Sequence, residues 1–146
     1  MDIQLFYAVL FPIILVSSIS TAWFVPSNYF SITHIKSESH IRCAVDLASG
    51  KLSNIGYDTS WKTLKQHPDS NFRFAGQTIP KFEKCISIVK MLHDQLPFIK
   101  CIGWDIVIDS QESIYVLEWN GLHNDIKFSE ATQGPCFPDL DWENIN

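Results

Sequence analysis

Apolar and polar positions alternate in two parts of this chain, and each part predicts an antiparallel hairpin. Residues 41–47 carry an apolar side chain at every second position, Gly50 suits the turn, and residues 52–57 return as a second strand. Residues 101–109 and 113–120 alternate in the same way and are joined by a short polar loop. The pattern therefore predicts four strands in antiparallel pairs.

Between the two hairpins, apolar residues recur at helical spacing from Pro80 to Pro97. This stripe consists of Phe82, Cys85, Ile86, Val89, Leu92 and Leu96. The preceding residues 58–80 are polar and irregular, and a loop of that length is often functional or mobile. A second, short helix is expected at 125–131. The predicted fold class is α+β, an antiparallel sheet covered by helices.

The first thirty residues are almost uncharged, because Asp2 is their only charged side chain. Residues 5–25 are long enough for a spanning helix, which needs ~20 apolar residues. Pro12 and several hydroxyl side chains weigh against a spanning helix, and a secretory signal would want a basic start. A membrane or signal segment, a buried strand pair and foreign sequence at a truncated start all stay open. We therefore divide the chain into residues 1–30, a domain at 31–136 and a loose tail at 137–146.

Charge is distributed unevenly along the sequence. Residues 31–100 carry ten Lys or Arg against six Asp or Glu, whereas residues 101–146 carry nine acids against Lys127 alone. A surface that binds nucleic acid has Lys and Arg clustered on one face, so this pattern gives no reason to expect a nucleic-acid partner. None of the four cysteines has the spacing of a zinc site, and we expect reduced thiols in a cytoplasmic protein.

The second hairpin carries the candidate chemistry. If Asp109 faces Ile114 across the loop, then Asp105 faces Glu118, with Cβ atoms ~5 Å apart. Ile114, Val116, Glu118 and Asn120 are expected on one strand face, so the Asn120 amide should point the same way as Glu118. Two facing carboxylates repel unless a cation lies between them, and oxygen ligands suit Mg²⁺ or Mn²⁺. The alternative is a surface hairpin that is acidic without a metal.

Two basic residues near the first hairpin, Lys36 and Arg42, could reach phosphate oxygens of a nucleotide. The alternative for both is a solvated strand end. No residue is singled out as directly catalytic.

The motifs Gly103-Trp104-Asp105-Ile106 and Leu117-Glu118-Trp119-Asn120 resemble the closing motif of ATP-grasp ligases. The resemblance is strongest to the sugar-transfer associated branch, which is related to α-L-glutamate ligase-like proteins. It extends upstream through 44–50, His67-Pro68-Asp69, Ile79-Pro80 and Gln95-Leu96-Pro97, and covers about residues 37–136.

This resemblance implies the C-terminal portion of an ATP-grasp fold, with ATP and a carboxylic acid as substrates. Asp105 would hold one magnesium ion, Glu118 would bridge two, and Asn120 would complete the second. The implied reaction runs through an acyl phosphate that an amine or similar nucleophile attacks.

The sequence departs from the family pattern in lacking a Gly-rich phosphate loop and the paired lysines of an N-terminal lobe. We therefore expect the isolated chain to be incomplete and inactive. The alternative is a non-catalytic remnant, or an interaction protein tethered to a membrane by residues 5–25.

Overall fold

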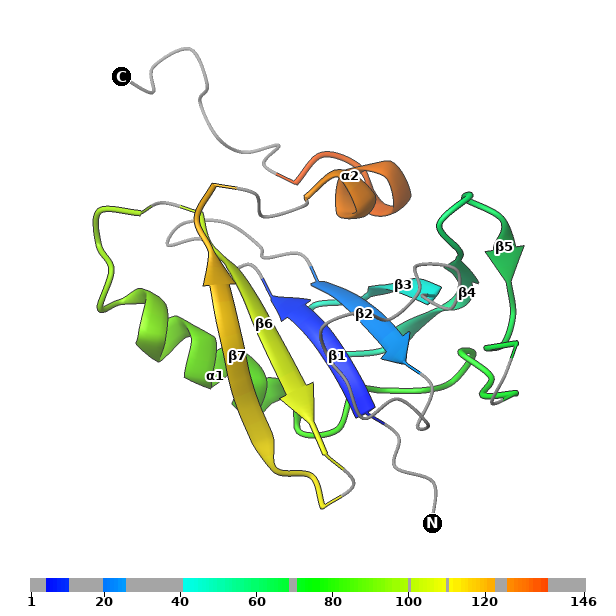
Figure 1. Ribbon diagram of the computed structural model, residues 1–146, viewed down its shortest axis with the longest axis horizontal. Helices are drawn as coiled ribbons and strands as arrows, with labels where there is room; N and C mark the ends of the chain where they lie inside the picture. The colour runs from blue at the N-terminus through cyan, green and yellow to red at the C-terminus, as the bar shows by residue number, and fades with distance from the viewer. Residues whose placement is uncertain are drawn as a thin grey trace.

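A computed structural model describes residues 5–10, 20–25, 41–68, 71–99, 101–109, 111–122 and 126–136, the first two ranges by their backbone only. Seven strands within these residues form one antiparallel sheet with the order β5-β4-β3-β2-β1-β6-β7 (Figure 1). The α+β fold class predicted from the sequence is confirmed.

Both predicted hairpins are present. The first pairs β3 (Ile41–Val45) with β4 (Leu52–Tyr57), and the second pairs β6 (Gly103–Ile108) with β7 (Ile114–Asn120). Gly50 lies in the first turn with a φ of 70°, in the left-handed region that glycine tolerates. The alternation of the sequence therefore identified both strand pairs.

The predicted helix is α1 (Phe82–His93), and it packs against one face of the sheet (Figure 1). Its buried side chains Phe82, Cys85 and Val89 share a core with alternate residues of β3 and β6. Those strand residues are Ile41, Cys43, Val45, Trp104, Ile106 and Ile108. One face of the sheet is thus apolar and covered by α1, as the period-two pattern requires.

The opposite face carries Arg42, which alternates with the core residues of β3. The second predicted helix, α2 (Lys127–Gln133), contacts β2 and β3 there, since Phe128 lies 5.8 Å from the Arg42 guanidinium carbon. The two helices therefore lie on opposite faces of the sheet.

The N-terminal segment contributes two strands, β1 (Leu5–Leu10) and β2 (Ser20–Val25), between β3 and β6. The segment thus forms a strand pair, which was one of the alternatives that the sequence left open, and the burial of its side chains stays a prediction. None of the helices in the described part of the chain is long and apolar enough to cross a membrane. Lys36, the 26–40 region around it and the predicted tail 137–146 lie outside the described residues.

The segment after β4 is more ordered than its composition suggested. It holds the short strand β5 (Thr63–Leu64) and two further backbone bridges, Lys51 to Thr78 and Gln66 to Arg73. Phe74 and Ile79 are fully buried in the core. These two apolar residues, spaced within a polar sequence, fasten the segment to the rest of the domain.

The four cysteines are free thiols, as expected from their spacing. Burial raises the pKa of Cys43 to about 12 and that of Cys85 to about 11. A thiol with so high a pKa stays protonated at neutral pH and reacts slowly. The cysteines of β3 and α1 are therefore packing residues.

Two glycines with similar backbone angles allow a test of the packing between the first turn and α1. A Cβ on Gly50 (φ 70°) would lie 2.6 Å from Cγ of Phe82, whereas a Cβ on Gly76 (φ 78°) would meet nothing within 4 Å. Both alanine variants carry a left-handed penalty of ~1–2 kcal/mol. Gly50→Ala should lose a further ~1–3 kcal/mol through overpacking, measured as the free energy of unfolding in urea. Equal losses in the two variants would contradict the packing shown here.

Candidate functional site

The structure brings Asp105 of β6 directly opposite Glu118 of β7, as the sequence predicted. The register that does so is not the predicted one. At the hairpin tip Ile108 pairs with Ile114, one residue out of step with the expected pairing of Asp109 and Ile114. A β-bulge at Leu117, between the Ile106–Val116 and Asp105–Glu118 pairs, then shifts the register by one residue.

The bulge corrects the sequence-based assignment of faces in β7. Val116 pairs with Ile106 and packs against the α1 core, whereas Glu118 pairs with Asp105 on the opposite face. Glu118 and Val116 therefore do not share a face, although strict alternation predicted that they would. The extra residue allows Ile114 and Val116 to pack against the core while Glu118 lies opposite Asp105 on the other face.

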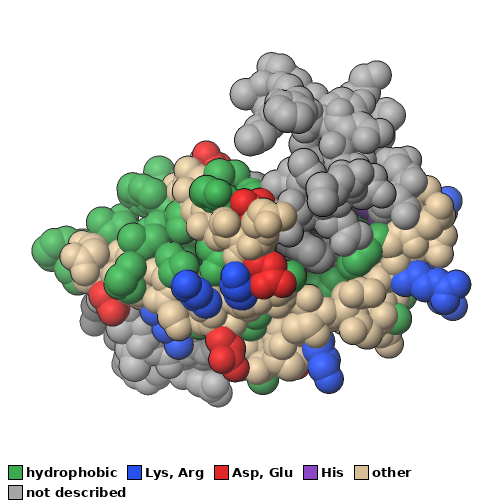
Figure 2. Space-filling model, turned by 90° about the horizontal axis from the view of Figure 1, so that it is seen from below, with side chains coloured by type: hydrophobic (Ala, Val, Ile, Leu, Met, Phe, Trp, Pro, Cys, Tyr) green, Lys and Arg blue, Asp and Glu red, His purple; other side chains and the backbone are tan. Residues whose placement is uncertain are grey.

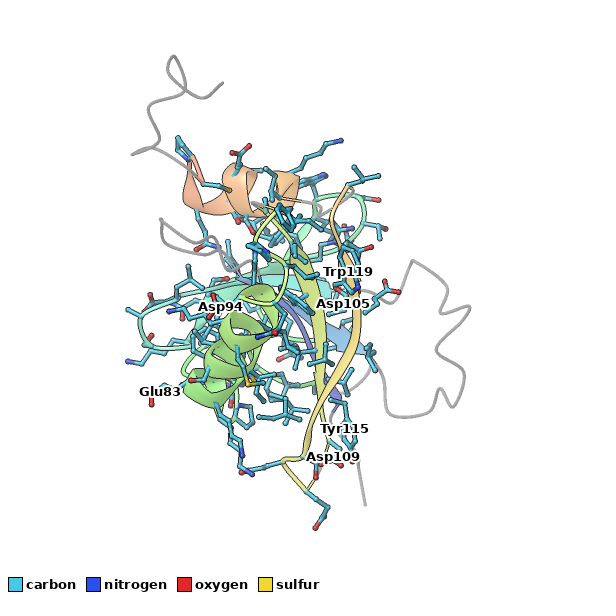
Figure 3. All side chains as sticks on the ribbon, turned by 90° about the vertical axis from the view of Figure 1, so that its left-hand side faces the viewer. Glu83, Asp94, Asp105, Asp109, Tyr115 and Trp119 are labelled. Atoms are coloured by element: carbon cyan, nitrogen blue, oxygen red, sulfur yellow. The ribbon has the colours of Figure 1, made fainter. Side chains whose placement is uncertain are left out.

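The two carboxylates have different surroundings. Asp105 is buried, with 6% of its surface exposed, whereas Glu118 is exposed. Asn120 lies beside Glu118, and its Nδ2 is 3.4 Å from Glu118 Oε1. Figure 3 shows Asp105 and Trp119 near one end of the β6–β7 hairpin, with Asp109 and Tyr115 near the other. The three predicted ligands are thus gathered at the end of the hairpin that is distant from its turn.

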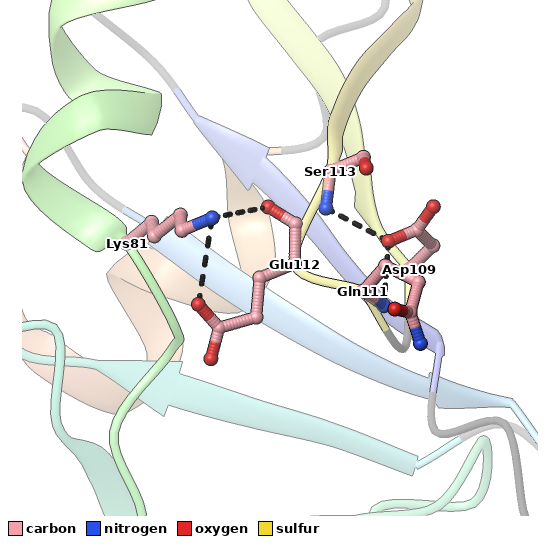
Figure 4. Close-up of polar contacts among 5 residues, drawn as sticks. All are labelled: Lys81, Asp109, Gln111, Glu112 and Ser113. Atoms are coloured by element: carbon pink, nitrogen blue, oxygen red, sulfur yellow. Dashed lines mark hydrogen bonds and ion pairs between the residues drawn. The ribbon is translucent and has the colours of Figure 1, made fainter.

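Asp109 holds the hairpin turn. Its Oδ1 accepts hydrogen bonds from the backbone N–H groups of Ser113 (2.7 Å) and Gln111 (2.9 Å) (Figure 4). Its Oδ2 accepts one from the Tyr115 hydroxyl. The Ser113 hydrogen bond is the main reason why the pKa of Asp109 lies below its usual range. Asp109 is therefore ionised at neutral pH and has a structural part in the turn.

Lys81 joins this turn to the start of α1. Its Nζ donates a hydrogen bond to the backbone oxygen of Glu112 (2.9 Å) and lies 3.5 Å from the Glu112 carboxylate (Figure 4). Both residues have left-handed backbones, with φ values of 50° and 56°. This contact connects the turn of the β6–β7 hairpin to the start of α1.

Arg42 lies on the same sheet face as Asp105 but at a distance. Cross-strand pairs link Arg42 through β2 and β1 to Val107, which is two residues from Asp105 and shares its face. Three steps of ~4.8 Å between strands separate β3 from β6, or roughly 14 Å. Arg42 is therefore not a neighbour of the carboxylate pair.

The surroundings of Arg42 include residues that the sequence did not single out. Tyr57, Trp61 and Phe128 form an aromatic cluster next to it, with ring centroids 5.7–5.8 Å apart. Arg42 and Tyr57 are cross-strand partners, and Trp61 follows Tyr57 closely in the chain. Phe128 comes from α2, and no local pattern in the sequence indicates that it returns to β3.

Positive and negative side chains are interspersed on the face shown in Figure 2. Over the part of the chain that is described, no group of three or more His, Cys, Asp or Glu side chains could hold a metal ion. The candidate set at the end of the hairpin is smaller and of another composition, namely two carboxylates and one amide.

The sequence pattern of the sugar-transfer associated ATP-grasp family matches residues 38–138, more than half of the chain. The protein belongs to this family. The match includes β3, β4, α1, the whole β6–β7 hairpin and α2. No curated protein and no solved structure was found to match the chain. Family membership supports ATP binding as the general function of this ATP-grasp domain.

The left-handed backbone of Glu112 provides a stability test of the hairpin. Three-residue hairpin loops commonly have glycine at such a position. Glu112→Gly should relieve ~1–2 kcal/mol of strain in the left-handed backbone. Two losses offset this gain, namely the greater freedom of glycine in the unfolded chain and the loss of an exposed ion pair, and each of these losses is below ~1 kcal/mol. We expect unchanged stability or a gain of up to ~1 kcal/mol in urea unfolding.

Glu112→Gln is the matched control, because it removes the charge and keeps the left-handed side chain. It should lose at most ~0.5 kcal/mol. Both variants lack the ion pair with Lys81, so if Glu112→Gly proved clearly less stable than Glu112→Gln, the freedom of glycine in the unfolded chain would outweigh the relief of backbone strain and the expectation would be wrong.

Proposed function

We propose that Asp105, Glu118 and Asn120 bind a divalent cation together with the phosphates of ATP, as part of a ligase that activates a carboxylic acid. The observation that carries this proposal is the direct pairing of a buried carboxylate with a second carboxylate inside the region that matches the ATP-grasp family. Two carboxylates that face each other repel, and a divalent cation between them removes that repulsion.

The chemistry of the donor set fits magnesium. All three groups offer oxygen ligands, and Mg²⁺ commonly uses one or two carboxylates and completes its shell with waters and substrate phosphates. Asn120 presents its Nδ2 to Glu118, so its amide group must turn over to offer the oxygen instead. When bound, the cation would neutralise charge on the transferring phosphoryl group. Manganese would fit the same ligands.

The proposed reaction begins with the acid substrate. Its carboxylate oxygen attacks the γ-phosphorus of ATP, ADP leaves, and an acyl phosphate forms. An amine or similar nucleophile then attacks the acyl carbon, and inorganic phosphate leaves. The contribution of the hairpin is to orient the phosphates in line for this transfer, since phosphoryl transfer depends mostly on positioning and charge neutralisation.

Phosphate contacts from Lys36 and Arg42 stay predictions. Lys36 lies outside the described residues. Arg42 is roughly three strand spacings from Asp105, so only a distant part of a nucleotide bound at the carboxylates could reach it. Its aromatic surroundings favour another ligand.

The metal site can be tested with manganese, whose binding enhances the relaxation rate of water protons. The wild-type chain should bind Mn²⁺ weakly by itself and more tightly with ATP, because the phosphates supply further ligands. Glu118→Gln and Asp105→Asn should each weaken Mn²⁺ binding at least ten-fold, since each removes a charged ligand.

Glu83→Gln is the matched control, because Glu83 lies on α1, on the other side of the sheet (Figure 3). It removes the same charge and should leave Mn²⁺ binding unchanged. Equal relaxation enhancement in the wild type, Glu118→Gln and Asp105→Asn would remove the proposed site.

A further expectation is that the purified 146-residue chain releases negligible ADP with a carboxylic acid and an amine present. The sequence offers no Gly-rich loop or paired lysines for the phosphates, and magnesium ligands supply only part of the positioning that the reaction needs. A coupled assay for ADP measures this directly. Robust, magnesium-dependent ADP release, lost in Asp105→Asn, would contradict the expectation while supporting the metal site.

A further inference from the structure

A pocket lies around Arg42, on the same sheet face as Asp105 but several strands away from it. The pocket has a volume of about 230 Å³ and is lined by Arg42, Tyr57, Asp58, Thr59, Trp61 and Phe128. These residues come from β3, from the end of β4 and the turn after it, and from α2. Ligand pockets commonly measure ~300–1,000 Å³, so this one has room for about one ring and a small substituent.

Three of the residues that line this pocket, Tyr57, Trp61 and Phe128, are aromatic. Phe128 is almost fully buried and stacks on Trp61, with centroids 5.8 Å apart and planes inclined by 25°. The Tyr57 ring is steeply inclined to both of these rings, with centroid distances of 5.7 Å. Trp61 nevertheless keeps 51% of its surface exposed. A large ring held this openly beside a pocket is suited to stacking against a ligand.

The backbone of Trp61 is held in an unfavourable conformation. Its φ is 64°, which is uncommon for a residue other than glycine. Asp58 maintains the turn, because Oδ1 accepts hydrogen bonds from the N–H groups of Ser60 (2.8 Å) and Lys62 (2.9 Å), and the Asp58 carbonyl accepts one from Trp61 (3.1 Å). Burial does not account for this strain, since the Trp61 ring is half exposed. The strain is consistent with a ring positioned for binding.

Arg42 supplies the positive charge of the pocket. Its guanidinium lies over the Phe128 ring, 5.8 Å from the centroid. A guanidinium carries five N–H donors in a planar fork whose geometry matches a carboxylate or a phosphate. Asp58 lines the same pocket, and its negative charge repels a doubly charged phosphate more strongly than a singly charged carboxylate. The electrostatics therefore favour a carboxylate.

We propose that this pocket binds a small carboxylate with a single planar ring, which stacks against Trp61 while its carboxylate pairs with Arg42. The site is separate from the ATP site and does not depend on the proposed metal ligands. It therefore gives Arg42 a role other than contact with the phosphates of ATP.

Ligand-observed NMR titration of the full chain with sodium benzoate tests this inference. Benzoate should bind at least ten-fold more tightly than benzamide, which has the same ring without the charge, and than acetate, which has the charge without the ring. This comparison uses only the wild-type protein, so it does not depend on the folding of any variant. Similar affinity for benzoate and benzamide, or no binding of benzoate, would overturn the proposal.

Two variants locate the binding. Trp61→Gly removes the ring and is compatible with the left-handed backbone, and Arg42→Gln removes the charge. Each should weaken benzoate binding at least ten-fold. The matched control is Asn71→Gly, which makes the same kind of change at a left-handed position (φ 55°) that does not line the pocket, and it should bind benzoate normally. Unchanged benzoate binding in Trp61→Gly and Arg42→Gln would show that benzoate does not bind in this pocket.

Competition separates this site from that of the nucleotide. Magnesium-ATP should not displace benzoate from the wild-type chain, and Glu118→Gln should bind benzoate normally. Displacement by magnesium-ATP would overturn the claim of a separate site. If the chain binds benzoate but not manganese, the metal site is wrong and the Arg42 pocket stands. If it binds manganese but not benzoate, the pocket is wrong and the metal site stands.

Discussion

The β-bulge at Leu117 determines what the rest of the candidate site can do. β7 has to bury Ile114 and Val116 against the α1 core, and it also has to direct Glu118 to the opposite face beside Asp105. A regular strand cannot satisfy both demands, because residues 114, 116 and 118 would then share one face. One inserted residue separates the apolar part of the strand from its polar end. Without that change of face, Glu118 and Asn120 would lie on the side of the sheet opposite to Asp105.

Local patterns predicted much of the fold. Alternation located both hairpins, and helical spacing located α1, because these elements are built from neighbours in sequence. The pairing of Asp105 with Glu118 was also predicted, but through two deviations that cancel: the tip register differs by one residue and the bulge restores it. Counting residues across a loop gives no information about a bulge. The bulge arises because the apolar residues of β7 pack on one face of the sheet while Glu118 lies on the other.

Features that depend on distant parts of the chain were not predicted. The segment after β4 was interpreted as a loop, although Phe74 and Ile79 anchor it in the core. The aromatic cluster at Arg42 requires Phe128 to return to β3 from a helix near the other end of the described chain. Arg42 was singled out for its charge, and the residues that surround it give that charge a more specific context. Sequence spacing alone carries no signal for such contacts.

The position of β1 has a consequence for the order in which the domain is assembled. β6 pairs on one side with β7, its neighbour across a tight turn, and on the other side with β1, where Phe6 lies opposite Ile108. Hairpins can close within microseconds, whereas contacts between distant parts of a chain are slow because a large loop must close first. The β6–β7 pairing can therefore form before β1 docks, although a lone two-stranded hairpin is only marginally stable until further elements pack on it. Asp105, on the strand shared by both pairings, reaches its final surroundings only when the beginning of the chain has docked beside it.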